Sequence, residues 1–463
     1  MSVKQLMIKN GTVYTDGTFK RAHVIVHKGL VEQIILSKTE VDESNFLKVV
    51  DASDSYVLPG FIDSHVHFND PGREEWEGFY SGSRAAAAGG TTTVFDMPLN
   101  SSPSVTNTHI LEMKKKHVSS RSWIHYGLWG GITAANVGDE EELKGMKEAG
   151  VIGFKAFLSD SGIGDFEKIS KDQLKEAMIK AKKLDAILAL HAEDQDLIEH
   201  YTAQLLLDKR TDRQAFLNSR PPSAELAAIT DALKKVEQTK VSVHFVHVSS
   251  PLAIELINQY KENGFDVSVE VCPHYLLFDE QDFLNVGPLL KCAPPLRSRD
   301  MVEELWKCVE RGWVDIIGTD HSPCPIQMKS EGDQNIWKAW GGIQGIQFGF
   351  QFFLQEAMKR GFSIEKLIPL LTSNVAKRFG LSEKKGDIQA GYDADLTIVK
   401  MNRQWSVNKS NTYTRHPYSP YEKLEATSKI MATVVSGDVI YENDQFIERT
   451  KEPMDVSAFS GFS

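Results

Sequence analysis

Two histidines separated by one residue, His65 and His67, lie in a short apolar segment at residues 61–68. Successive side chains of a β-strand point to opposite faces, so a strand here would project both imidazoles from the same face. Two neutral imidazoles on one face can hold zinc or a similar divalent ion. The alternative is that both are ordinary buried polar residues, and a pair of histidines alone is too short a motif to decide.

Four more groups that could bind a metal or transfer a proton follow in later apolar segments. They are Lys155, His191, His247 and Asp320. Each lies in or at the carboxyl-terminal part of a strand-like segment. In a barrel of parallel strands, all of these groups would meet the histidine pair at one mouth. Such a gathering of imidazoles and a carboxylate indicates a site for divalent metal ions.

Lys155 is unusual in this set because a protonated amine repels a metal ion. It lies between Phe154 and Phe157, and burial among apolar groups lowers the pKa of an amine. A neutral amine can take up carbon dioxide and become a carbamate, which is an anion that can bridge two metals. The alternative is a charged lysine paired with Asp320 or Glu193, and the residues taken alone favour that ion pair.

The elements that must position these groups are eight strand-like segments, most of them separated by helical stretches. The strand-like segments are residues 61–68, 91–97, 123–128, 153–158, 186–191, 241–247, 266–271 and 314–320, and the helical stretches include 171–183, 224–236, 251–263 and 301–311. Eight such units predict an α/β fold of the TIM-type (β/α)8 barrel class, with its chemistry at the carboxyl ends of the strands. The alternative is an open doubly wound sheet. A nucleotide role for that fold needs a glycine-rich turn after the first strand, which the sequence lacks.

The two ends of the chain show a different pattern. Residues 1–55 and 385–450 alternate apolar and polar residues in short runs separated by glycine turns, which is typical of antiparallel strands. Neither end is long enough for a core of its own. We therefore expect both ends to build one composite β-sandwich beside a barrel of residues 56–384, with residues 451–463 as a C-terminal tail.

Composition limits the function classes. The chain has 463 residues and a formal net charge of −11, which argues against a nucleic-acid partner. It has no run of apolar residues long enough to cross a bilayer, so no membrane partner is expected. The four cysteines, Cys272, Cys292, Cys308 and Cys324, are spaced neither as a disulfide scaffold nor as a zinc motif. A reduced, cytoplasmic protein is the simplest interpretation.

Six segments together resemble the binuclear cyclic amidohydrolases, a family that includes dihydroorotases, hydantoinases and allantoinases. These segments are residues 60–67, 153–155, 191–193, 247–250, 318–323 and 386–396, so the resemblance covers most of the chain. It implies that His65, His67 and Asp320 hold the more buried metal, and that His191 and His247 hold the second. It also implies that carboxylated Lys155 bridges the two ions, and that the protein is a homotetramer. Zinc suits these ligands, as do cobalt, manganese and nickel.

Three stretches narrow the substrate within this family. Asn69 stands where dihydroorotases carry an arginine that clamps the substrate carboxylate, and asparagine offers only neutral hydrogen bonds. Residues 73–78, 320–325 and 336–345 are similar to the corresponding stretches of allantoinases. The loop at residues 159–166 lacks the tyrosine that hydantoinases place there. The resemblance therefore implies hydrolysis of allantoin to allantoate, with hydantoinase (dihydropyrimidinase) or dihydroorotase activity as the alternatives.

The resemblance also implies roles for individual residues. Asn69, Ala293 and Ser322 are expected to contact the substrate, Ala293 through its main chain. Two metals would share a hydroxide. This hydroxide is available near neutral pH because metal coordination lowers the pKa of bound water to roughly 7. Asp320 would take the proton and deliver it to the departing ring nitrogen. A rival from another class is a non-catalytic scaffold built on the same barrel. Such scaffold proteins lack a complete ligand set, whereas this chain keeps every candidate ligand.

Overall fold

The centre of the molecule consists of short parallel strands that are buried along their whole length. The computed structural model describes residues 4–422 and 424–459. Three strands pair in the order β6-β7-β8, and six pair in the order β14-β13-β12-β11-β10-β9. Their bounds are β6 (Phe61–Val66), β7 (Thr91–Asp96), β8 (His125–Leu128), β9 (Gly130–Gly131), β10 (Phe154–Phe157), β11 (Leu188–His191), β12 (Val243–Phe245), β13 (Val267–Val271) and β14 (Ile316–Ile317). The predicted α/β class with parallel strands is confirmed.

The two parallel sheets adjoin each other at both edges. Only Trp129 separates β8 from β9 along the chain. At the other edge, Val66 forms a parallel bridge with His321, and the backbone N–H of His67 donates to the carbonyl of His321 at 2.8 Å. Within the described residues these contacts do not amount to one continuous ladder, so the pairing defines two sheets and not a closed ring.

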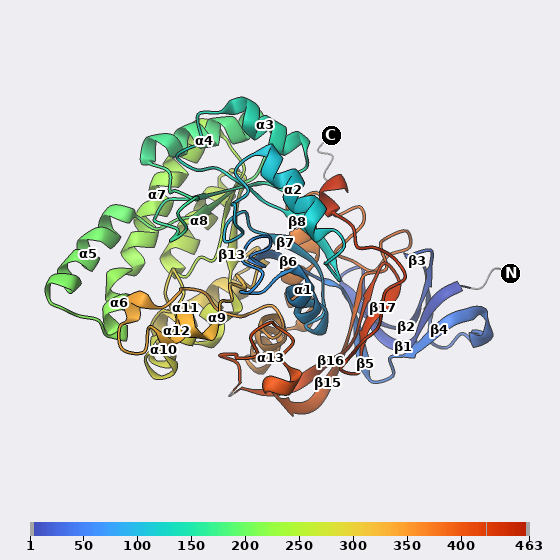
Figure 1. Cartoon of the computed structure of the whole chain (residues 1–463). Helices are drawn as coiled ribbons and strands as arrows, with labels where there is room; N and C mark the ends of the chain where they lie inside the picture. Colours follow the sequence, from blue (N-terminus) through green and yellow to red (C-terminus); the bar gives the residue numbers. More distant parts are fainter. Residues whose placement is uncertain (1–3, 423, 460–463) are drawn as a thin grey trace.

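Helices lie around the outside of these strands (Figure 1). They are α1 (Phe79–Ala88), α2 (Thr108–Val118), α3 (Glu140–Glu148), α4 (Lys171–Lys183), α5 (Gln195–Leu207), α6 (Arg213–Ser219), α7 (Pro222–Thr239), α8 (Pro251–Glu262), α9 (Pro273–Leu277), α10 (Glu280–Val286), α11 (Arg299–Glu310), α12 (Ile326–Ser330), α13 (Gly349–Lys359), α14 (Ile364–Leu371) and α15 (Ser373–Arg378). The four helical stretches predicted above correspond to α4, α7, α8 and α11.

Helix α4 illustrates why these segments are helical. Ser170 caps its first turn, and the side chain of Gln173 bonds back to the backbone of Ser170 to complete a capping box, which satisfies two of the free N–H groups at a helix start. Leu174, Ala177, Met178 and Ala181 are its buried residues. Their spacing of three, one and three places them on a single face, and that face covers the central strands.

The two chain ends share one nine-stranded sheet beside the central strands. Its strands are β1 (Lys4–Thr15), β2 (Thr18–His27), β3 (Leu30–Leu36), β4 (Phe46–Asp51), β5 (Ser55–Pro59), β15 (Leu396–Ser406), β16 (Glu425–Val435), β17 (Asp438–Glu442) and β18 (Gln445–Phe446). β5 pairs with β1 and also, antiparallel, with β15. The two ends therefore lie side by side, as the blue and red strands of Figure 1 show.

The structure gives further detail at the two expected boundaries near residues 55 and 450. β5 extends the terminal sheet to Pro59, past the expected boundary at residue 55, because its backbone pairs with β15. The described part of the C-terminal tail expected at residues 451–463 packs against the rest of the chain. The N–H of Met454 donates to His125 Nδ1 at 2.9 Å, and Val456 is fully buried. Residues 460–463 lie outside the described part of the chain.

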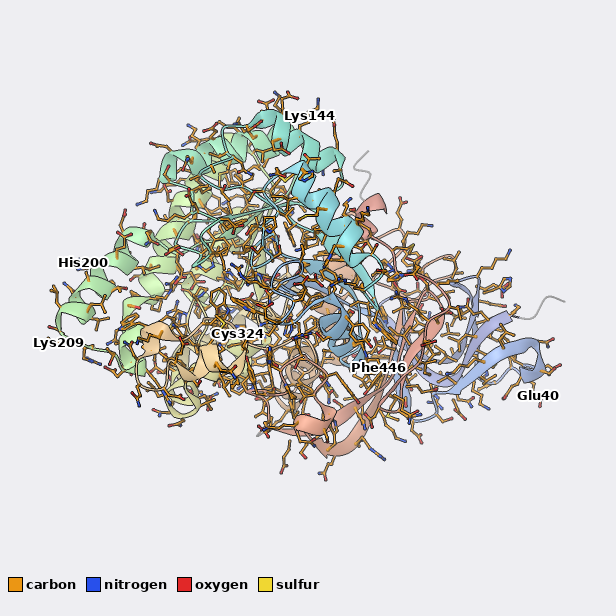
Figure 2. The ribbon with its side chains drawn as sticks, in the orientation of Figure 1. Glu40, Lys144, His200, Lys209, Cys324 and Phe446 are labelled. Carbon is orange, nitrogen blue, oxygen red and sulfur yellow. The ribbon has the colours of Figure 1, made fainter. Side chains whose placement is uncertain are left out.

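The helices α5 and α6 project from the side of the molecule opposite the terminal sheet. Figure 2 shows His200 and Lys209 at that outer end, with Glu40 at the opposite end. Cys272, Cys292, Cys308 and Cys324 are all buried and free. No helix among the described residues combines the length and the apolar character needed to cross a membrane.

Candidate active site

A cavity of about 650 Å³ opens at the carboxyl ends of the parallel strands. Five of the six predicted ligands line it, namely His65, His67, His191, His247 and Asp320. They come from the ends of β6, β11, β12 and β14, or from the residues directly after them. The sixth, Lys155, lies on β10 and is fully buried. The structure therefore brings the predicted residues to one mouth.

His65, His67 and Asp320 form the first cluster. The Nε2 atoms of the two imidazoles lie 3.3 Å and 3.2 Å from Asp320 Oδ1, and the candidate ligand atoms of all three residues lie within 4.8 Å of one another. Burial alone would raise the pKa of Asp320, but the charge of His65 and the hydrogen bond from His67 hold it well below its usual value. The carboxylate is therefore ionised at neutral pH.

His191 and His247 form the second cluster. His191 Nδ1 lies 3.0 Å from His247 Nε2, and their ring centroids are 4.6 Å apart. Burial lowers the pKa of both imidazoles, so both are neutral near pH 7 and each has a lone pair for a metal. The ring of His191 is stacked on Phe157 at 4.6 Å between centroids, which fixes its plane.

The backbone at these ligands is unusual. His247 and Asp320 have φ values of +42° and +45°, in the left-handed region that non-glycine residues rarely adopt. Such a conformation costs roughly 1–3 kcal/mol and persists where the surrounding structure demands it, most often at functional sites. In both residues it occurs where the chain leaves a parallel strand.

Lys155 has no partner for its amine. The side chain is fully buried, and Nζ has no hydrogen-bond partner among the described residues. Within those residues no carboxylate lies within 4.0 Å of it, so the expected alternative of an ion pair with Asp320 or Glu193 is wrong. Burial lowers the pKa of Lys155 to about 7. The amine lies 5.1 Å from the centroid of the Phe157 ring.

A buried glutamate that the sequence reasoning missed orients the first cluster. Glu270, on β13, accepts hydrogen bonds from His65 Nδ1 at 2.8 Å and from Ser64 Oγ at 2.7 Å. This leaves His65 Nε2 directed at Asp320, the arrangement by which proteins fix the ring nitrogen that binds a metal. A charged residue in a fully buried, valine-rich strand was the signal in the sequence.

Glu193 orients His191 in the second cluster in the same way that Glu270 orients His65. It is fully buried and accepts from His191 Nε2 at 2.8 Å, which leaves Nδ1 facing His247. Although burial opposes it, Arg220 holds the pKa of Glu193 well below its usual value. Arg220 lines the cavity, and nothing in the sequence marked it, because it lies in a connection between two helices.

Two of the three predicted substrate contacts lie at the cavity, and the third does not. Ala293 and Ser322 line the cavity. Asn69 is buried and is not among the described residues that line it. Its Nδ2 donates to the carbonyl of Pro323 at 3.4 Å, so the asparagine connects the chain after β6 to the chain after β14. The structure does not place it with the other predicted contacts.

Two tryptophans and Lys291 line one wall of the cavity, and the buried Lys329 supports the loop that carries the tryptophans. Trp337 and Trp340 both line the cavity. Lys291 Nζ donates to the carbonyls of Ile336 and Ala339 at 2.8 Å and 2.6 Å, and Lys329 Nζ donates to the carbonyl of Trp340 at 3.0 Å. Burial lowers the pKa of Lys291 to about 7 and of Lys329 to about 8. Hydrogen bonds from the buried amines of Lys291 and Lys329 thus fix the loop at residues 336–340 in place.

The donor set fits a pair of divalent ions. It consists of four imidazoles, one ionised carboxylate and a buried amine without a hydrogen-bond partner among the described residues. A deprotonated ligand set of nitrogen and oxygen atoms suits zinc and related metals. The unpartnered Lys155 Nζ is otherwise unexplained, since an unsatisfied buried polar group is costly.

Comparison with known proteins gives consistent results. The sequence profile described as the amidohydrolase family matches residues 56–440. An allantoinase of Rubrobacter xylanophilus is 39% identical over 448 residues, which is 96% of each chain. An allantoinase of Bacillus velezensis is 40% identical over 438 residues, covering 95% of this chain and 94% of the relative. Among solved structures, the L-hydantoinase (dihydropyrimidinase) of Arthrobacter aurescens superposes with a TM-score of 0.92 at 30% identity, covering 96% of this chain and 98% of the other.

Proposed function

The chain belongs to the amidohydrolase family, and from that premise we propose that it is a metal-dependent hydrolase that opens the ring of allantoin to give allantoate. The observation that carries the proposal is the convergence of four imidazoles and Asp320 on one cavity, together with the fully buried, unpartnered amine of Lys155 on β10. The substrate is supported by relatives named allantoinase that match nearly the whole chain at 39% and 40% identity.

We propose that the two parallel sheets form one (β/α)8 barrel that begins at Phe61, and that the terminal strands form a composite β-sandwich. The bridge between Val66 and His321 and the short step from β8 to β9 support closure. Buried residues from both chain ends share one apolar cluster, which supports a joint unit. A homotetrameric assembly and a cytoplasmic location are proposed from the family resemblance alone.

We propose that His65, His67 and Asp320 hold one divalent ion and that His191 and His247 hold the other. Lys155, carboxylated on Nζ, would bridge them, and zinc is the proposed metal. When bound, such ions supply a nucleophile from water near neutral pH and polarise the carbonyl under attack. The pKa of Lys155, lowered to about 7 by burial, supports carboxylation, because only the neutral amine reacts with carbon dioxide.

The residues of the chain then supply positioning and proton transfer. Hydrolysis adds a hydroxyl group to the ring carbonyl carbon, breaks its bond to nitrogen and leaves a proton to be moved to that nitrogen. Asp320 is ionised and faces the cavity, so it can accept the proton from water and deliver it to the departing nitrogen. Glu270 and Glu193 keep the two imidazole clusters aimed inward.

A second candidate function is hydantoinase activity. It is favoured by the likeness to the L-hydantoinase of Arthrobacter aurescens, with its TM-score of 0.92. That likeness comes with 30% identity, below the 39% and 40% of the allantoinase relatives. A dihydroorotase would need a clamp for the substrate carboxylate at Asn69, and Asn69 carries no charge. A non-catalytic scaffold is disfavoured because the candidate ligand set is complete.

The test is turnover of allantoin, hydantoin and dihydroorotate side by side by the purified, zinc-loaded protein. We expect allantoin to have the highest kcat/KM of the three. Faster opening of hydantoin or dihydroorotate would overturn the choice of substrate. Absence of turnover of all three at full metal loading would overturn the enzymatic proposal and favour the scaffold.

A further inference from the structure

Arg220 is held in place from two sides at the wall of the cavity. It directly follows α6, and 15% of its side chain is exposed. Nε donates to Glu193 Oε1 at 3.1 Å and Nη2 donates to Glu193 Oε2 at 2.7 Å. Its own carbonyl accepts from Arg297 Nη1 at 2.6 Å. The guanidinium is therefore fixed by a forked ion pair, the arrangement in which arginine loses little freedom on binding a further group.

One nitrogen of this guanidinium, Nη1, has no hydrogen-bond partner among the described residues, although Nε and Nη2 are both engaged. Nη1 is also not among the buried atoms that lack a partner, so it is accessible. Since Arg220 lines the cavity, a rigid, charged hydrogen-bond donor is presented beside the proposed metal ligands, one carboxylate away from His191.

The other cation in the cavity wall does not compete for this role. Lys291 also lines the cavity, but its Nζ is already bonded to two backbone carbonyls. Lys155 is fully buried and is not among the described residues that line the cavity. A ligand in this cavity that carries a carbonyl or carboxylate away from the reacting ring would thus meet Arg220 as its charged donor.

We propose that Arg220 binds the carbonyl of the ureido arm of the substrate, so that the site selects ring amides bearing a planar hydrogen-bonding arm over bare rings. This inference rests on the proposed function, since allantoin carries such an arm and hydantoin does not. The arm takes no part in bond breaking. Its contact is therefore present in both the ground state and the transition state, and it contributes mainly to KM.

The test replaces Arg220 with Met and with Lys in the zinc-loaded full-length protein. Arg220→Met is expected to raise KM for allantoin by about 10- to 100-fold, the range for one hydrogen bond to a charged group. Measured at saturating zinc, so that any weakening of metal binding through Glu193 is compensated, it should keep kcat within a few-fold. Arg220→Lys should recover part of KM, because it restores the charge but not the fork.

Arg213→Met is the matched control. Arg213 lies on α6 and donates to the carbonyls of Leu284 and Asn285, outside the cavity. It should leave KM, kcat and metal content unchanged.

Two results would overturn the inference while leaving the proposed function intact. One is an unchanged KM in Arg220→Met. The other is a fall in kcat together with loss of metal at constant KM, which would mean that Arg220 acts only by holding Glu193. Failure of the wild-type protein to hydrolyse allantoin would instead overturn the proposed function, and this inference with it.

Discussion

Replacing Glu270 with Gln should weaken metal binding while leaving the fold intact. Glutamine has nearly the same size as glutamate, so the packing of β13 is preserved. The change removes the negative charge that His65 Nδ1 approaches at 2.8 Å and Ser64 Oγ at 2.7 Å. Burial opposes ionisation of Glu270, but His65 and His244 hold its pKa well below the usual value. The native residue is therefore a full anion at neutral pH.

The size of the effect follows from the hydrogen bond to His65. A bond to a charged group contributes about 1.5–3 kcal/mol and a neutral one about half of that. Losing the charge should therefore cost about 1.5 kcal/mol, or roughly ten-fold in affinity. Partners of metal-binding histidines typically contribute about 10- to 100-fold. We expect the affinity for zinc to fall within that range, with kcat reduced at sub-saturating metal.

The assay is competition for zinc against a chelator of known affinity, with kcat measured at fixed free zinc. Glu225→Gln is the matched control, because Glu225 is equally buried. It accepts from the N–H of Ser249 at 2.7 Å and pairs with Arg297, and it contacts none of the proposed ligands. The account is refuted if Glu270→Gln binds zinc as tightly as the wild type, or if Glu225→Gln weakens binding to the same extent.

Three further predictions concern the buried lysines Lys155, Lys385 and Lys291. Lys155→Ala should lose metal and activity with partial rescue by a short carboxylic acid, measured by metal analysis and turnover; unchanged metal content would remove its bridging role. Lys385→Met should lower the free energy of unfolding by about 3–5 kcal/mol, because it removes the lysine that pairs with the buried carboxylates of Asp393 and Asp395; denaturant titration showing under 1 kcal/mol would contradict this. The pKa of Lys291 is lowered from 10.5 to about 7, so between those pH values the unfolded chain binds more protons than the folded one. The contribution of Lys291 to the free energy of unfolding should therefore rise with pH by up to about 1.4 kcal/mol per pH unit between pH 7 and 10.5, and stay constant below pH 7. The check is the difference in unfolding free energy between the wild type and Lys291→Met, measured across this range. A difference that does not rise with pH would contradict the prediction.

Much of the site could be predicted because a parallel α/β fold translates sequence position into spatial position. His65, His191 and Asp320 were assigned to the ends of strand-like segments, and those ends meet in the cavity. The burial of Lys155 was also predicted, from the phenylalanines beside it. In each case a local pattern and one rule about parallel strands were sufficient.

Other features depend on contacts between segments far apart in the chain, and sequence patterns do not encode them. Arg220 and Glu193 are 27 residues apart, and only the return of the chain after α6 brings them together. The terminal sheet continues past residue 55 because β5 pairs with β15 from the other end of the chain. In the C-terminal tail, the backbone N–H of Met454 donates to His125 Nδ1, a contact between residues 329 positions apart in the sequence.

The most direct test of the central claim is an anomalous-difference map at the zinc absorption edge from crystals of the zinc-loaded protein. The account predicts two peaks, one beside His65, His67 and Asp320 and one beside His191 and His247, with additional density on Lys155 Nζ between them. Peaks elsewhere, or an unmodified Lys155 with a single ion at full loading, would contradict it.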